Sequence, residues 1–121
     1  MAAETKEADI IMYIIINEDL KMSKGKCIAQ ACHVTQKITE EIIRKSYESP
    51  STPEECLTYM KWRTNCTKVI LKTNFEQLLK LSKLPEARYM VDIINTKECL
   101  TAVGFFPSNK MAKEFEAYKK F

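Results

Sequence analysis

The sequence predicts an α/β fold: a three-layer α/β/α arrangement around a mixed four-stranded sheet, with the order β-α-α-β-α-β-β-α, in one domain over residues 9–121. Three observations predict it. Strand-length apolar runs alternate with segments of helical periodicity, which favours parallel crossovers. Residues 10–17 are almost wholly apolar, as in a central strand buried on both faces. Two later strand-like runs are joined by a short link, which favours an antiparallel pair or a neighbouring edge strand.

The first half of the chain supplies one strand and two helices. A lysine-rich loop follows the strand and leads into a helix over about residues 26–47. The stretch Ser-Pro-Ser-Thr-Pro at 49–53 ends this helix. Thr52 with Glu55 forms a capping box, with Pro53 at the first helical position, so a second helix is expected to run to about Trp62.

The second half supplies three strands and two helices. We expect strands at about residues 68–73, 89–94 and 99–106 and helices at about 75–84 and 109–118. Asn74 is placed to cap the first of these helices, and Pro85 to end it. Pro107 and Ser108 stop the last strand, and Ser108 is placed to cap the last helix.

Composition and charge narrow the class of protein. The chain has 121 residues, 45% of them hydrophobic, which suits one globular core. A net charge of +3 permits contact with RNA but does not require it. Residues 1–8 are expected to be a disordered tail, and they lack the basic start and apolar run of a secretory signal. We therefore expect a cytoplasmic protein.

The cysteines suggest neither a disulfide framework nor a metal site. There are five of them, an odd number, with no Cys-x-x-Cys pair. Reduced thiols are the expectation for such a chain. Zinc sites need paired ligands at short spacing, and the single histidine gives poor support for one. We therefore expect no bound metal.

The most informative stretch joins the first strand to the first helix. Lys21, Lys24 and Lys26 surround Gly25 at the point where the helix begins. Free backbone N–H groups and the helix dipole favour an anion at such a position. In α/β sheets, ligands also gather at the carboxyl ends of strands. The loop is therefore a candidate anion-binding site.

Helical spacing places Lys26, Gln30, His33 and Lys37 on one narrow stripe of the long helix. Apolar side chains occupy the opposite side, at Ile28, Ala31, Ile38 and Ile42. The stripe has two interpretations. It is either an ordinary solvated helix face or a polar site built on a rigid helix directly after the anion-binding turn.

The segment Asp-Leu-Lys-Met-Ser-Lys-Gly-Lys at 19–26, followed by Ala29-Gln30 and then His33, resembles the type-2 peptidyl-tRNA hydrolase family. In that family a strand is followed by Asp-Leu-Lys-Met-Gly-Lys-Gly-Lys and by a helix that begins Ala-Ala-Gln and reaches a histidine. The likeness continues at residues 68–72 and 101–104, and it spans about residues 10–121.

A second family segment is kept only in part. The family has Asp-Ala-Gly-Arg-Thr, then a Pro-Gly loop and a threonine that opens the last strand. Here Asp92 and Thr96 keep their spacing and Thr101 matches the later threonine, but Ile-Ile-Asn replaces Ala-Gly-Arg and the loop is shorter. Asp92 also has a second interpretation as an ordinary strand residue. These departures resemble the divergent "peptidyl-tRNA hydrolase domain-containing" branch.

The resemblance implies hydrolysis of the ester between a peptide and the 3′ ribose of tRNA, a reaction that needs no cofactor. Lys26 would offer positive charge to the oxyanion or a phosphate, and Asp92 would orient or deprotonate water. Thr96 and Thr101 would position the water or the substrate carbonyl. His33 is a general base by its chemistry, but its place two turns inside the helix equally suits support or a structural cap.

The resemblance also assigns substrate contacts. Gln30 would bind the substrate or hold Lys26, and Lys21, Lys24 and Gly25 would contact tRNA phosphates irrespective of sequence. The family suggests a homodimer. The alternative function is a catalytically inactive tRNA- or protein-binding module on the same fold.

Overall fold

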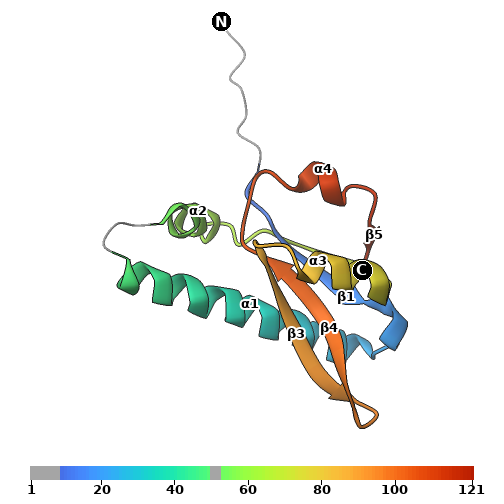
Figure 1. The fold of residues 1–121 in the computed structure, drawn as a ribbon. Coiled ribbons are helices and arrows are strands. Elements are labelled where there is room, and N and C mark those ends of the chain that lie inside the picture. The colour runs from blue at the N-terminus through green and yellow to red at the C-terminus, as the bar shows by residue number, and fades with distance from the viewer. Residues whose placement is uncertain (1–8, 50–52) are drawn as a thin grey trace, which may run out of the picture.

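Strand β1, Met12–Asn17, lies at the centre of an open mixed sheet (Figure 1). The computed structural model describes residues 9–49 and 53–121. All six side chains of β1 are buried. The strand pairs in parallel with β2, Lys68–Thr73, and antiparallel with β4, Lys97–Phe105. The expected α/β class and the central position of the first apolar run are therefore confirmed.

The sheet has five strands in the order β3-β4-β1-β2-β5, so the prediction of four strands is wrong. Strand β3, Ala87–Ile94, forms a hairpin with β4 and is one edge of the sheet. The added strand β5, Lys119–Lys120, pairs antiparallel with β2 at the other edge. The free edge of β2 explains the addition, because its unpaired backbone groups accept any segment that passes beside them.

The predicted last helix over 109–118 is also wrong, since α4 spans only Ala112–Phe115. Ser108 exchanges two backbone hydrogen bonds with Ile11, which holds the chain extended before α4. Phe115 is buried, and its ring lies 4.8 Å from that of Tyr13 and 5.2 Å from that of Tyr118. These aromatic contacts fix a single turn, after which the chain is free to reach β2.

Helices cover both faces of the sheet (Figure 1). Helices α1, Lys24–Glu48, and α2, Glu54–Trp62, pack on one face, and α3, Phe75–Ser82, packs with α4 on the other. Alternate residues of β1 serve the two cores, as the period of a strand requires: Met12, Ile14 and Ile16 face α1, whereas Tyr13 and Ile15 face α3.

Helix α1 lies very close to β4. A Cβ atom added at Gly104 would meet Ile38 Cδ1 and Val34 Cγ2 at 3.0 Å each. The absence of a side chain at this position lets the helix approach the sheet, and this places the polar start of α1 beside the hairpin of β3 and β4.

Two expectations fall on residues that the structure does not describe. The predicted disordered tail at 1–8 and the capping residue Thr52 both lie outside the described residues. Within residues 9–49 and 53–121, none of the helices combines the length and the apolar character needed to span a bilayer.

Candidate active site between helix α1 and the β3–β4 hairpin

The loop after β1 is held by Asn17, a buried polar side chain at the end of an apolar strand. Its Nδ2 donates to the Leu100 carbonyl at 2.9 Å, and its Oδ1 accepts from Asp19 N at 3.0 Å. The second bond caps a short 3-10 helix, Glu18–Leu20. Asn17 is a positioning residue that the sequence motifs did not identify. The feature of the sequence that could have indicated it is a polar residue at the end of an apolar strand.

Ser23 caps α1, and its Oγ accepts a hydrogen bond from Lys26 N at 3.2 Å. The helix therefore begins at Lys24, two residues before the predicted start. This cap fixes the direction in which the Lys26 side chain leaves the first turn, toward the hairpin.

Lys26 and Asp92 form the central contact of the site. Lys26 Nζ lies 2.6 Å from Asp92 Oδ2, and the two side chains are 37% and 36% exposed. Gln30 Nε2 donates to the same carboxylate oxygen at 2.9 Å. Thr101 Oγ1 lies 2.5 Å from Gln30 Oε1. Four of the candidate residues therefore form one connected chain of polar groups.

The polarity of this chain follows from the chemistry of its members. An ionised carboxylate only accepts hydrogen bonds, so the amide nitrogen of Gln30 must face Asp92. The amide oxygen then faces Thr101, whose hydroxyl must be the donor. Gln30 and Thr101 are fully buried, whereas Lys26 and Asp92 reach the surface. Two buried, hydrogen-bonded side chains thus hold an ion pair that is open to solvent.

An irregularity in the hairpin places Thr101. Met90 pairs with Ala102, whereas Val91 pairs with Leu100, and Thr101 is left as an extra residue on β4. Such a β-bulge re-aims a side chain locally. Here the Thr101 hydroxyl points to Gln30 and also lies 3.1 Å from the Met90 carbonyl.

The surroundings of Asp92 lower the pKa of its carboxyl below the ordinary value. The hydrogen bond from the Lys26 ammonium is the main cause, and the Ile93 N–H, which donates to Oδ1 at 2.7 Å, is the next. Asp92 is therefore a carboxylate at neutral pH and a weaker base than an ordinary aspartate.

The remaining substrate-binding candidates lie at the exposed start of the helix. Lys21 takes a left-handed backbone conformation, with φ of 49°, where the 3-10 helix ends. Lys24 and Gly25 are both exposed, and a Cβ atom added at Gly25 would meet no atom within 4 Å. The first turn of α1 is thus open to a ligand that approaches its backbone.

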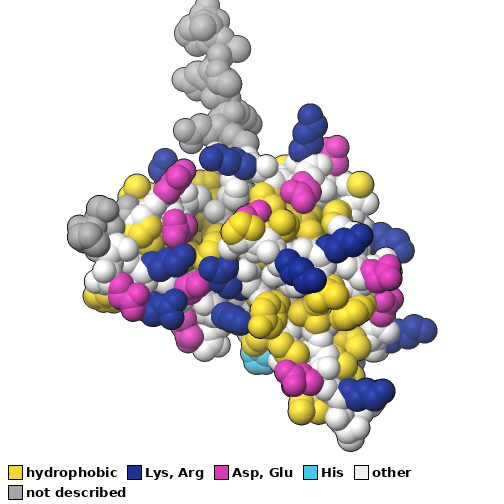
Figure 2. All heavy atoms as spheres, viewed as in Figure 1, with side chains coloured by type: hydrophobic (Ala, Val, Ile, Leu, Met, Phe, Trp, Pro, Cys, Tyr) yellow, Lys and Arg dark blue, Asp and Glu magenta, His cyan; other side chains and the backbone are white. Residues whose placement is uncertain are grey.

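Two candidates lie apart from the ion pair. Thr96 is exposed in the two-residue turn of the hairpin, where it and Asn95 both have positive φ, and its hydroxyl donates to the Asn95 carbonyl. His33 lies seven residues after Lys26, about 10 Å along the helix. It is exposed (cyan in Figure 2) and lines a hollow of about 370 Å³ with Lys37 and Met90.

The predicted division of α1 into a packed and an open face is confirmed at Ile38 and Ile42, which are buried, and is wrong at two other positions. Gln30, placed on the open stripe, is fully buried, and Ile28, placed on the packed side, is 61% exposed. The polar stripe faces the hairpin at several points, since Lys37 Nζ also donates to the Tyr89 carbonyl at 2.9 Å. The helix spacing is as expected, but its buried side is turned toward β3 and β4.

Comparison with known proteins identifies one family. A family model described as "Peptidyl-tRNA hydrolase PTH2" matches residues 10–112. No curated protein matches the chain. The matched range contains every residue of the polar chain and the lysine-rich loop.

Proposed function

Since the chain belongs to the peptidyl-tRNA hydrolase PTH2 family, we propose that it hydrolyses the ester bond of peptidyl-tRNA, releasing the peptide and free tRNA. The observation that carries the proposal is the ion pair of Lys26 and Asp92. Gln30 donates a hydrogen bond to its carboxylate, and the exposed first turn of α1 lies next to it. We also propose that the chain belongs to the divergent "peptidyl-tRNA hydrolase domain-containing" branch of this family.

Ester hydrolysis requires a placed water and a stabilised oxyanion. The Lys26 ammonium has three donors and gives one to Asp92, so two remain for the developing negative charge. The ammonium is aimed by the carboxylate before substrate arrives. This preorganisation is the main contribution that we assign to the pair.

Asp92 is assigned an orienting role. A general base works best when its pKa lies near the working pH, and the pKa of Asp92 is lowered instead. Its Oδ1 accepts one bond, from Ile93 N, and retains a lone pair that a water molecule can donate to. Asp92 thus directs a water toward the carbonyl that Lys26 polarises.

The tRNA contacts are assigned to the start of α1. Lys21 and Lys24 are exposed cations beside the free N–H groups of the first turn, a combination that favours phosphate. The open space at Gly25 lets a phosphate approach the backbone. Thr96 and His33 receive no direct role, because neither contacts the ion pair.

The test is release of an N-acetylated amino acid from its tRNA by the purified chain. We expect turnover by the wild type and a loss of about a hundredfold or more in Lys26→Ala. Lys80→Ala, on the distant α3, is the matched control and should keep the wild-type rate. Absence of release by the wild type would contradict the function, and full activity in folded Lys26→Ala would contradict the site.

A further inference from the structure

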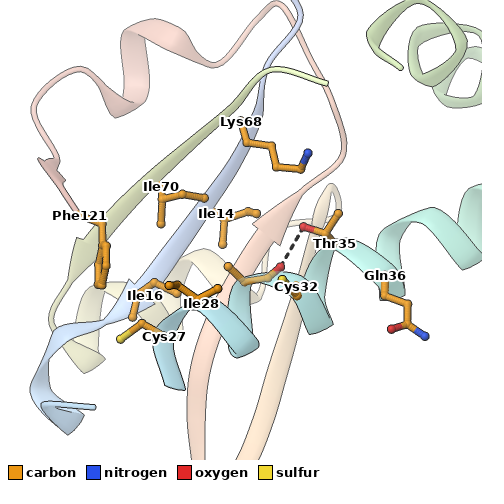
Figure 3. A pocket seen from close by; sticks show the side chains of 11 residues that line it. Ile14, Ile16, Cys27, Ile28, Cys32, Thr35, Gln36, Lys68, Ile70 and Phe121 are labelled. Atoms are coloured by element: carbon orange, nitrogen blue, oxygen red, sulfur yellow. Dashed lines mark hydrogen bonds between the residues drawn. The ribbon is translucent and has the colours of Figure 1, made fainter. Parts of the chain in front are cut away.

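A second cavity lies beside α1 (Figure 3), and neither Lys26 nor Asp92 lines it. It has a volume of about 550 Å³. Helix α1 packs on β1, β4 and β3, and the cavity opens where the helix stops short of β2. Its wall on α1 is formed by Ile28 and Ala31, which point away from the side that carries Lys26.

The cavity is apolar over most of its length. Ile14, Ile16 and Ile70 form the floor, and Phe121 closes the side at the sheet edge (Figure 3). Ile28 is 61% and Phe121 is 50% exposed, so both lips present apolar surface to solvent. A concave apolar site of this size is typical of small-molecule pockets rather than of ordinary surface.

One end of the cavity is cationic. Lys68 lies at the opposite end from Ile16 and Phe121 (Figure 3). Its ammonium lies 4.9 Å from the centre of the Trp62 ring and donates to the Cys66 carbonyl at 3.2 Å. Among residues 9–49 and 53–121 no carboxylate forms a salt bridge with it, so two of its donors are available to a ligand.

The length of the cavity is set by α1. The lining residues Cys27 and Gln36 mark its two ends on the helix, and a separation of nine positions along a helix is about 13 Å. The site thus offers an elongated apolar wall along the helix and a single positive charge at one end. That pattern complements a linear chain with a negatively charged head.

We propose that this cavity binds a single-chain amphiphile with an anionic head, of the class of medium-length aliphatic carboxylates. The alkyl chain lies over Ile14 and Ile70 against Ala31, and the carboxylate pairs with Lys68. Trp62 is buried beside the head-group end and is the only tryptophan of the chain, so its fluorescence reports on the site.

The first experiment titrates the full chain with dodecanoate below its micelle concentration, by calorimetry and Trp62 fluorescence. We expect saturable binding at one site, and affinity lower by about tenfold or more in Ala31→Phe, which fills the cavity. Ala112→Phe, at an exposed position on α4, is the matched control. Unchanged affinity in a folded Ala31→Phe would overturn the proposal.

The second experiment tests the head group without altering the apolar walls. Lys68→Glu should weaken dodecanoate by about tenfold and strengthen dodecyltrimethylammonium, since the sign of the end charge is reversed. Lys80→Glu should change neither affinity. Equal binding of both amphiphiles to the wild type would remove the assignment of an anionic head.

The third experiment uses the cysteines of the chain as internal probes. Cys32 lines the cavity and is exposed, whereas Cys99 lies on the hairpin. Bound dodecanoate should slow alkylation of Cys32 severalfold and leave Cys99 unchanged, as read by mass spectrometry. The oligomeric state of the wild type and of Ala31→Phe should be measured alongside. If the wild type self-associates and Ala31→Phe does not, a second copy of the chain covers the cavity and the proposal fails.

Discussion

Gln30 and Asp92 stand 62 positions apart in the chain, and their side chains meet through a hydrogen bond of 2.9 Å. Gln30 is fully buried, yet its amide lies directly beneath a carboxylate that reaches solvent. The contact ties α1 to the β3–β4 hairpin at the point where Lys26 emerges. The properties of the site therefore depend on residues behind it as much as on the exposed pair.

The buried support can be tested at Thr101. Replacement by valine leaves Gln30 Oε1 without its donor, and an unpaired buried acceptor costs about 1–3 kcal/mol. We expect Thr101→Val to lower the free energy of unfolding in urea by that amount and to reduce peptidyl-tRNA hydrolysis, since Gln30 loses its orientation. Thr58→Val on α2 is the control, and equal stability of the two variants would contradict the assigned hydrogen bond.

The pH dependence of Asp92 follows from its lowered pKa. The ordinary pKa of this carboxyl, which applies to the unfolded chain, is 3.8. In the folded protein the carboxyl stays ionised at pH values at which the unfolded chain is already protonated there. Its stabilising effect is therefore complete above about 3.8 and is lost as the pH falls through the lower folded pKa. Lys26→Ala removes the main cause, so the Asp92 pKa should rise toward 3.8 in a carboxyl NMR titration. An unchanged pKa would contradict the ion pair.

The two glycines should respond oppositely to alanine. At Gly104 a methyl group meets the β-branched Val34 and the end of Ile38, and overpacking of this kind costs about 1–3 kcal/mol. At Gly25 it meets nothing, and alanine favours the helix by up to about 1 kcal/mol. Thermal unfolding of both variants tests this difference. We further expect Gly25→Ala to raise KM, because the added methyl obstructs a phosphate.

Thr96 offers a test of whether the hairpin turn takes part in the reaction. A β-branched residue is strained at a φ of 68°, and hairpin turns with two positive φ values favour Asn-Gly. Thr96→Gly should therefore raise the melting temperature, with a gain of about 1 kcal/mol, and keep the rate of hydrolysis. A large fall in rate without a change in stability would assign Thr96 a catalytic role.

Several features could be predicted because their causes are local. The apolar run at β1 must be buried in any fold. The spacing of residues in α1 places the same residues on the same side of the helix whatever the helix packs against. The lysine-rich loop and the spacing of Lys26 and Gln30 are likewise present in the sequence itself. The sequence thus indicated the α/β class, the central strand and the helix that carries the candidate site.

Other features depended on contacts between distant segments. Helical periodicity placed Ile38 and Ile42 on the packed side of α1, where they are buried, but it could not show that Gln30 is buried against Thr101 of the hairpin. The short α4 and strand β5 arose because the aromatic packing of Phe115 and the free edge of β2 outweighed helical propensity.

The residue types at positions 26, 30, 92 and 101, and their separate chemistry, were determined by the sequence alone. Their union into one polar chain was decided only by the tertiary structure. The bulge that aims Thr101 exists because two strands pair out of step, and a pairing register is a property of two segments that neither contains by itself.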